Sequence, residues 1–368
     1  MTIELILVGF GNVARRFTSL LEERRSQLAA DHDLTPRIVG IATRRGRAYA
    51  ARGLDAAAFG ATLRDDRGAS AFPHAVGSTL EFLGDALDRS AEAARDGRLV
   101  VVETTTLDID AGEPAISHVT TALAAGAHVV TANKGPAAFA YQTLSRLADR
   151  VNRRFLFEGA VMDGVPVFNL ARDTLRGVEI LGFRGVVNTT TNYIINAMEE
   201  GQAFDEALVE MQAMGVAEAD ASLDIEGWDA AAKTAALANV LMNASLTPQR
   251  VERQGITPDL MPQAIEARRA GRRLKLVARA GYEGSRITAR VAPEELPSDD
   301  LLASLDGQQN ALILHTDLLG EIAIVQRGSS LTHTAYALVS DLLTIAKDLQ
   351  SARATRPLRP RAPRGRSL

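Results

Sequence analysis

Apolar runs and helical patterns alternate through the first 150 residues of the chain. Residues 3–8 form an apolar run, and apolar side chains then recur at helical spacing from Val13 to Leu28. Further apolar runs at 37–43, 99–102 and 128–131 each predict a strand followed by a helix. This alternation predicts a Rossmann-type α/β fold, a doubly wound parallel sheet with right-handed crossovers. We expect residues 1–150 to form a dinucleotide-binding domain.

The pattern changes after residue 150. Strands are predicted at 154–161, 178–187, 274–280, 287–291, 311–316 and 321–326, mostly with connections short enough for an antiparallel sheet. Helices are expected at about 205–214 and from Trp228 onward, and a last helix at about 329–350 would complete the first domain. Residues 151–328 are therefore predicted to form a second, α+β domain for substrate binding and dimerisation. Residues 48–73 are interpreted as a variable insertion, and the Arg- and Pro-rich residues 351–368 as a disordered basic tail.

Composition narrows the classes of function. The 368 residues carry 41 Lys and Arg against 45 Asp and Glu, so the formal net charge is −4 and gives no basic footprint for nucleic acid. No apolar run reaches the length of a membrane span, and the start of the chain lacks a secretory signal pattern, so we expect a cytoplasmic protein. The absence of cysteine excludes disulfides, thiolate nucleophiles and cysteine-ligated zinc, and the six histidines show no ligand spacing.

A glycine turn follows the first predicted strand directly. Gly9-Phe10-Gly11-Asn12-Val13-Ala14 matches G-x-G-x-x-A, in which glycines let a pyrophosphate approach the backbone at a helix N-terminus. The alternative is a plain glycine turn. The second predicted strand ends at Arg44 and Arg45, where an acidic residue would favour NAD and an arginine suits the 2′-phosphate of NADP. We therefore expect NADP, with NAD still possible; the alternative is a basic surface loop.

Polar side chains follow several predicted strands at their carboxyl ends, where doubly wound sheets bind ligands. Thr105 follows the strand at 99–102, and Lys134 follows the strand at 128–131. Lys134 is thereby expected where a nicotinamide ring and its substrate would meet. The hydroxyl-rich run at 188–193 is expected at a helix N-terminus, and Ser78 with Glu81 predicts a capping box on an earlier helix.

Residues 215–233 combine an acidic stretch with a single lysine on a new helix. Five carboxylates fall in this stretch, at Glu218, Asp220, Asp224, Glu226 and Asp229. A helix that begins near Trp228 places Asp229 and Lys233 on one face, because residues four apart are neighbours on a helix surface. Taken alone, the pair could be a solvated salt bridge beside an acidic loop.

With these motifs placed, residues 3–345 closely resemble the homoserine dehydrogenase family, in a short form without a C-terminal regulatory domain. Residues 215–233 resemble its signature, with Gly227-x-Asp229-x-x-x-Lys233 as the most specific part. Thr131-Ala132-Asn133-Lys134-Gly135-Pro136 and Asn188-x-Thr190-Thr191-Asn192-Tyr193 resemble two further family motifs. The resemblance implies that Lys233 carries the acid/base proton and that Lys134 lies between cofactor and substrate. It implies substrate contacts at Glu218 and Asp229, with Asp224 beside them. The residues expected along the nucleotide are Gly9, Gly11, Asn12, Val13, Arg44, Arg45, Thr105, Lys134, Gly215 and Gly328.

The implied reaction interconverts L-homoserine and L-aspartate 4-semialdehyde with NAD(P)(H), as in threonine and methionine biosynthesis. It needs a base for the hydroxyl proton, an acceptor for the hydride and carboxylates for the ammonium group, and the sequence supplies residues for each role. To act as a base near neutrality, Lys233 needs a pKa below its reference value, which a desolvated site would favour and neighbouring carboxylates would oppose. The resemblance also implies a homodimer whose contacts lie in the second domain, and no threonine feedback.

Three departures from the family pattern bear on substrate identity. Thr189 stands where the family usually has glycine, Met162-Asp163 replaces part of a glycine-rich loop, and Ser329-Ser330 replaces a Gly-Ala-Gly-like element. In many members the loop that corresponds to Glu158, Val161, Asp163 and Val165 binds a monovalent cation, largely through backbone carbonyls. Asp163 is thus a solvent-facing turn residue, an extra cation ligand or a contact to the substrate's ammonium group. The alternatives are a related dehydrogenase for another small amino or hydroxy acid and a catalytically silent nucleotide sensor; retention of both lysines argues against the sensor.

Overall fold

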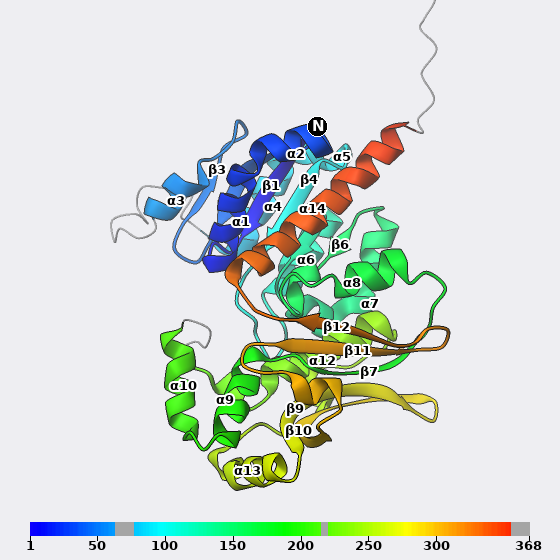
Figure 1. The fold of residues 1–368 in the computed structure, drawn as a ribbon. Helices are drawn as coiled ribbons and strands as arrows, with labels where there is room; N and C mark the ends of the chain where they lie inside the picture. Colours follow the sequence, from blue (N-terminus) through cyan, green and yellow to red (C-terminus); the bar gives the residue numbers. More distant parts are fainter. Residues whose placement is uncertain (63–76, 215–219, 355–368) are drawn as a thin grey trace, which may run out of the picture.

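The computed structural model describes residues 1–62, 77–214 and 220–354, which build two six-stranded sheets (Figure 1). The first sheet has the order β3-β2-β1-β4-β5-β6, and its strands pair in parallel except for the antiparallel edge strand β3. The strands are β1 (Thr2–Val8), β2 (Thr35–Ala42), β3 (Arg47–Tyr49), β4 (Leu99–Glu103), β5 (His128–Thr131) and β6 (Phe155–Leu156). The predicted parallel sheet is confirmed.

Helices cover both faces of this sheet because successive side chains of a strand point to opposite faces. Along β1, Ile3, Leu5 and Leu7 pack with α1 and α14, whereas Ile6 and Val8 pack with α4 and α6. Figure 1 shows α14 beside α1, as the prediction of a closing helix for the first domain requires. The helices are α1 (Asn12–Glu23), α2 (Arg25–His32), α3 (Ala56–Thr62), α4 (Thr79–Arg89), α5 (Ala91–Arg95), α6 (Ala115–Ala124), α7 (Gly135–Arg150) and α14 (Leu331–Ala354). The Ser78–Glu81 capping box is confirmed at the start of α4.

The second sheet has the order β12-β11-β7-β9-β10-β8 and is antiparallel except where β8 pairs with β10. Its strands are β7 (Ile180–Val186), β8 (Glu252–Arg253), β9 (Arg272–Glu283), β10 (Arg286–Pro297), β11 (Asn310–Thr316) and β12 (Gly320–Gln326). Its helices are α9 (Thr189–Glu199), α10 (Phe204–Ala213), α11 (Ser222–Ile225), α12 (Trp228–Leu241) and α13 (Met261–Arg269), and the short α8 (Val167–Asn169) precedes β7. The predicted antiparallel sheet and the helix from Trp228 are confirmed.

Three sequence predictions differ from the structure. The first is the tail at 351–368: α14 continues to Ala354, and residues 355–368 lie outside the described residues. The strand predicted at 154–161 is wrong beyond Leu156: residues Glu158–Ala160 form a 3-10 turn, in which the Glu158 N–H donates to Asp341 of α14 at 2.9 Å instead of to a strand. The region interpreted as an insertion contains β3 and α3, while residues 63–76 lie outside the described residues. The hairpin was not predicted because the turn Thr43-Arg44-Arg45-Gly46 lacks the flanking pattern of apolar residues that would indicate two paired strands. In the structure, the Thr43 hydroxyl accepts hydrogen bonds from both Arg45 N and Gly46 N.

The two halves of the chain are joined where α7 meets α12. The buried Asn239 side chain of α12 donates to the carbonyl oxygens of Ala137 at 3.2 Å and Ala138 at 3.1 Å, both in α7. These contacts join the C-terminal part of α12 to the start of α7. Within the described ranges, every helix falls short of the apolar length that crossing a bilayer requires.

Candidate functional site

Two lysines from distant segments share one carboxylate at the junction of the two halves. Lys134 follows β5 and precedes α7, while Asp229 and Lys233 lie one turn apart on α12. Lys134 Nζ is 3.1 Å from Asp229 Oδ1, and Lys233 Nζ is 2.8 Å from Asp229 Oδ2. The side chains of Asp229 and Lys233 are each only 15% exposed, so this pair is not a solvated surface salt bridge.

Asn188 organises the carboxylates, a role that the sequence analysis did not assign to it although it begins one of the family-like motifs. Its Nδ2 donates to Asp224 Oδ1 at 2.7 Å and to Asp229 Oδ2 at 2.9 Å, and its Oδ1 caps α9 by accepting from Thr191 N at 2.9 Å. One buried amide therefore fixes a helix start and two carboxylates. The sequence signal was an asparagine immediately before a helix, which is a favoured N-cap position. Its contacts to Asp224 and Asp229 depend on the fold.

The electrostatics of this cluster keep Lys233 protonated. Burial lowers the pKa of Lys233, but Asp229, followed by Asp163 and Asp224, outweighs burial and raises that pKa above the usual value. Burial raises the pKa of Asp229, yet Lys134 and Lys233 hold it far below its usual range. Burial and the neighbouring Asp229 raise the pKa of Asp224. The sequence-based requirement was a lowered lysine pKa, and the structure shows the opposite direction because three carboxylates act on one ammonium.

Lys233 is also held by the backbone of the second sheet. Its Nζ donates to the Val187 carbonyl oxygen at 2.7 Å, directly before the α9 cap. The ammonium group therefore has a carboxylate and a carbonyl as acceptors, and its position is set by both α12 and the end of β7. A lysine fixed in this way can give a proton to, or take one from, an oxygen atom of a bound molecule.

The turn between β1 and α1 packs closely against the residue after β4 and leaves the start of α1 open. Gly9 has a φ of 91°, and a Cβ added there would lie 2.7 Å from the Thr104 backbone. Gly11 precedes α1 without a side-chain cap, and a Cβ added there would meet nothing within 4 Å. The N–H groups at the start of α1, at Asn12 and Val13, are thus available to an anion such as a pyrophosphate.

A buried carboxylate organises the neighbouring strand ends. Glu103 at the end of β4 accepts from Thr131 Oγ1 at 3.0 Å and from both the N–H and the hydroxyl of Thr105. Asn133 donates to the Thr105 carbonyl at 3.0 Å and accepts from Gly135 N at 2.8 Å. Thr105 and the residue before Lys134 are therefore tied together, as expected for ligand-binding residues at adjacent strand ends.

The remaining predicted nucleotide residues fall in three places. Arg44 and Arg45 are exposed in the turn that links β2 to β3, and this turn contains no acidic residue. Gly328 lies between β12 and α14, with open space around a Cβ added there. Gly215, together with the predicted substrate residue Glu218, lies outside the described residues.

The loop predicted to bind a cation follows β6. The buried Glu158 carboxylate accepts from Phe168 N at 2.9 Å and from Asn169 N at 2.6 Å, and burial raises its pKa to about 7. The Asp163 carboxylate is half-buried and is engaged by three side chains, so it does not face solvent freely. Among the described residues, no three His, Asp or Glu side chains gather as a metal site would require. Any cation here would depend on backbone carbonyls, such as those of Val161 and Val165.

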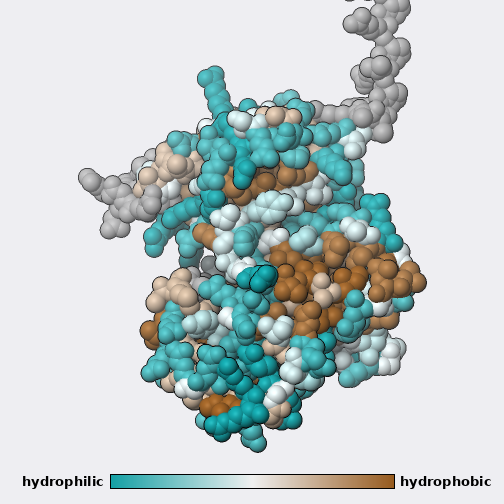
Figure 2. Space-filling model, viewed as in Figure 1, coloured by the Kyte–Doolittle hydropathy of each residue, from teal (hydrophilic) through white to brown (hydrophobic). Residues whose placement is uncertain are grey.

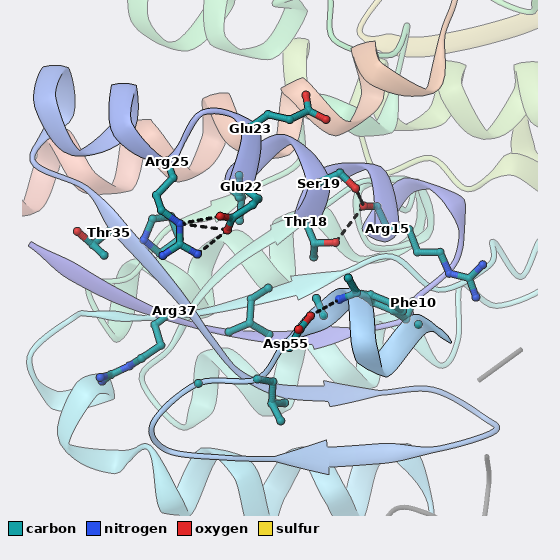
Figure 3. A pocket seen from close by; sticks show the side chains of 18 of the residues that line it. Phe10, Arg15, Thr18, Ser19, Glu22, Glu23, Arg25, Thr35, Arg37 and Asp55 are labelled. Atoms are coloured by element: carbon teal, nitrogen blue, oxygen red, sulfur yellow. Dashed lines mark hydrogen bonds and ion pairs between the residues drawn. The ribbon is translucent and has the colours of Figure 1, made fainter. Parts of the chain in front are cut away.

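A separate cavity of about 1210 Å³ starts beside the glycine turn and extends along α1 on its β2 side (Figure 3). Phe10 of the glycine turn contributes to its wall, together with other apolar, hydroxyl-bearing and charged residues. These charges are largely paired, as in the contacts of Arg25 with Glu22 at 2.5 Å and of Arg37 with Glu4 at 2.6 Å. Neither lysine of the cluster lines this cavity.

Comparison with known sequences gives consistent results over almost the whole chain. The sequence model for "Homoserine dehydrogenase, NAD binding domain" matches residues 9–158, and the model for "Homoserine dehydrogenase" matches residues 166–343. The chain is 39% identical to an NAD(+)-dependent homoserine dehydrogenase from Pseudomonas canavaninivorans, covering 93% of this chain and 96% of that protein. It is 34% identical to a homoserine dehydrogenase from Methanocaldococcus jannaschii, covering 93% and 98%.

Solved structures share the fold. A homoserine dehydrogenase from Thiobacillus denitrificans superimposes with a TM-score of 0.77 at 28% identity, covering 98% of this chain and 76% of the other. A structure from Archaeoglobus fulgidus superimposes with a TM-score of 0.79 at 29% identity, covering 94% and 99%.

Proposed function

Because the chain belongs to the homoserine dehydrogenase family of nicotinamide-dependent oxidoreductases, we propose that it interconverts L-homoserine and L-aspartate 4-semialdehyde with Lys233 as the acid/base. The observation that carries this proposal is the Asp229 carboxylate shared by Lys134 and Lys233. This carboxylate brings Lys134, at the end of β5 in the first sheet, next to Lys233 on α12.

The residues suit both directions of the reaction. In the oxidation, neutral Lys233 would take the proton of the substrate hydroxyl, and a bound nicotinamide would supply the acceptor for the hydride that leaves the carbon bearing that hydroxyl. In the reduction, protonated Lys233 donates that proton to the aldehyde oxygen as the hydride returns. The raised pKa of Lys233 favours its protonated form and therefore the reductive direction near neutrality. Asp229 and Asp224, with Glu218, supply carboxylates for the ammonium group of the substrate.

Two departures from the family pattern are accounted for by contacts within the chain. The Thr189 hydroxyl accepts from Asn310 Nδ2 of β11 at 2.9 Å, and the Asp163 carboxylate accepts from Ser329 Oγ at 2.6 Å. Both side chains therefore have partners within the chain, and neither departure needs a different substrate to account for it.

The test is a panel of initial rates. Homoserine, threonine, serine and related hydroxy acids are compared in the presence of NADP and of NAD, with the wild-type chain and Lys233→Ala. The proposal expects homoserine to give by far the highest kcat/KM. A higher kcat/KM with another hydroxy acid would support a dehydrogenase with a different substrate. The absence of hydride transfer with every compound would favour a nucleotide sensor.

For the cofactor, we propose a preference for NADP. Arg44 and Arg45 are exposed in the β2–β3 turn, and no carboxylate in that turn is available to hold a ribose 2′-hydroxyl. The Pseudomonas relative is described as NAD(+)-dependent. The ratio of kcat/KM for the two cofactors decides between NADP, which the arginines favour, and NAD, which that relative uses.

For the cation, we propose a monovalent ion held by the backbone carbonyls of the 158–165 loop. One feature near this loop fits a positive charge: Asp341 accepts from Glu158 N through Oδ2, while its buried Oδ1 has no hydrogen-bond partner in the described chain. Burial, together with Glu158, raises the pKa of Asp341 to about 8, so a cation bound beside it would have to displace the proton that this carboxyl holds at neutral pH. Rates measured in sodium, potassium and a bulky organic cation test this proposal.

For assembly, we propose a homodimer through the second sheet, with residues 151–328 as the domain for substrate binding and dimerisation and residues 1–150 with α14 as the nucleotide domain. Figure 2 shows hydrophobic surface gathered over the second-sheet half of the molecule. Large apolar side chains are exposed there, at Leu181 in β7, Val325 in β12, and Leu318 and Leu319 in the turn before β12. Exposed apolar area of this kind marks an interaction surface. Light scattering of the wild-type chain and of Val325→Asp tests the dimer.

A further inference from the structure

Two consecutive residues with side chains adopt the left-handed backbone in the loop after β6. Met162 has a φ of 52° and Asp163 a φ of 53°, a conformation that glycine adopts at no cost and other residues avoid. Met162 is buried at 2% exposure. A conformation of this kind persists only where surrounding contacts enforce it.

The Asp163 carboxylate supplies those contacts. Its Oδ2 accepts from Gln326 Nε2 at 3.0 Å and from Ser329 Oγ at 2.6 Å, and its Oδ1 accepts from Thr334 Oγ1 at 3.1 Å. The three donors come from the end of β12, the connector after it and the first turn of α14. All three donors are neutral, so they satisfy the oxygens without cancelling the charge.

The loop also lies directly on the start of α14. A Cβ added to Gly164 would lie 2.4 Å from the His333 carbonyl oxygen. Glycine at 164 therefore permits the close approach, and Asp163 beside it fastens the approach with side-chain hydrogen bonds. The contact joins the loop to the 326–334 segment, which contains Gly328.

We propose that Asp163 is a positioning residue, whose carboxylate clamps the loop near Lys233 to the 326–334 segment and so fixes the substrate side of the site against the cofactor side. The clamp pairs two unusual features of this chain, Asp163 and Ser329, through a single hydrogen bond. Because it acts on the site proposed above, it depends on that proposed function.

The charge of Asp163 reaches the catalytic cluster as well. Burial lowers the pKa of Lys233, and Asp163 is one of three carboxylates, with Asp229 and Asp224, that together raise it. With both oxygens engaged by neutral donors, Asp163 acts on Lys233 through space and not by contact. A clamp therefore has two separable parts, which are the hydrogen bonds and the charge.

A double-mutant cycle tests the hydrogen bonds. Asp163→Asn, Ser329→Ala and the double variant are compared by kcat/KM for homoserine and by the Kd for NADPH from fluorescence. Each single change is expected to lower kcat/KM roughly fivefold to tenfold. The double variant should have a kcat/KM no lower than that of the less active single variant. Ser330→Ala is the matched control, since Ser330 makes no bond to Asp163, and should stay within about twofold.

Thr334 provides a second route if Asp163→Asn folds poorly. Thr334→Ser keeps the hydroxyl and should retain wild-type rates, whereas Thr334→Val keeps the shape and should behave like Ser329→Ala. Multiplicative losses in the Asp163–Ser329 cycle, or equal rates for Thr334→Ser and Thr334→Val, would overturn the clamp. A change confined to sodium or potassium dependence would instead make Asp163 a cation ligand.

The clamp and the proposed function fail in different ways. If homoserine is not oxidised, the proposed function fails, and the cycle is measured on the best hydroxy acid of the panel and on NADPH affinity. If homoserine is oxidised normally by every variant, only the clamp fails. A changed substrate ranking in Asp163→Asn would make Asp163 a specificity residue and also overturn the clamp.

Discussion

The glycine turn at the start of α1 and the lysine cluster at the start of α12 are built on different principles. The glycine turn consists of backbone, and its essential property is the absence of a side chain at Gly9. The lysine cluster consists of charges from two separate segments and the Asn188 amide from a third, which meet at Asp229. The first should therefore tolerate no added atom, and the second no lost charge or donor. Five predictions test this contrast, beginning with the largest effect.

Lys233→Ala should abolish turnover and leave cofactor affinity nearly unchanged. Loss of a positioned general base costs about 100-fold or more. Steady-state rates together with NADPH binding measure both quantities. Activity above about a tenth of wild type would remove Lys233 from its role, because a general base contributes more than that.

The same lysine sets the sign of the pH dependence. Its pKa lies above the usual value, so the neutral form that oxidation needs grows as pH rises, and the protonated form that reduction needs persists through neutrality. Oxidation should therefore accelerate toward alkaline pH, while reduction should stay level and then fall. A flat oxidation profile from mildly acidic to alkaline pH contradicts a lysine base.

Asn188→Ser should separate the two tasks of the asparagine. Serine can still cap α9, so stability should change by less than about 1 kcal/mol. It cannot donate to both Asp224 and Asp229, and the displaced carboxylates should lower kcat roughly 10- to 100-fold. Asn188→Ala, which loses both tasks, is the comparison for thermal unfolding. Unchanged kcat in the serine variant would show that the amide only caps the helix.

Gly9→Ala and Gly11→Ala should differ in their effect on the free energy of unfolding, but both should weaken NADPH binding. The added methyl at residue 9 would meet the Thr104 backbone, and the alanine would have to adopt a positive φ. Together these effects should cost on the order of 1–3 kcal/mol of folding free energy. At residue 11 the space is open, so stability should change by less than about 0.5 kcal/mol. Both should weaken NADPH binding, roughly tenfold at residue 11. Wild-type affinity in Gly11→Ala would place the pyrophosphate elsewhere.

Replacing Arg44 and Arg45 together with serine should have the smallest effect. Exposed ionic contacts contribute about 1 kcal/mol, so NADP should weaken roughly fivefold while NAD changes little. Titrations of both cofactors against the variant and the wild type measure this. Equal losses for the two cofactors would make the arginines part of an ordinary surface turn.

The contrast also explains what the sequence could predict. The β1 strand, the glycine turn and α1 are contiguous, and Asp229 and Lys233 are four residues apart on one helix, so local patterns indicated both. The bridge from Asn188 to Asp229 spans 41 residues and depends on how α9 meets α12. The direction of the Lys233 pKa shift depends on Asp163 and Asp224 as well, which come from two other segments. The strand predicted at 154–161 ended early because Asp341, far along the chain, takes the Glu158 N–H.

The Asn239 side chain, which joins α12 to α7, bears on when the spacing of the two helices is established. It also exchanges hydrogen bonds with Leu246, so its amide is fully engaged inside the protein. The start of α7, which directly follows Lys134, and the C-terminal part of α12 are consequently fixed against each other. The spacing of these two helices is thus a product of folding, and a bound molecule does not have to supply the entropy cost of setting it.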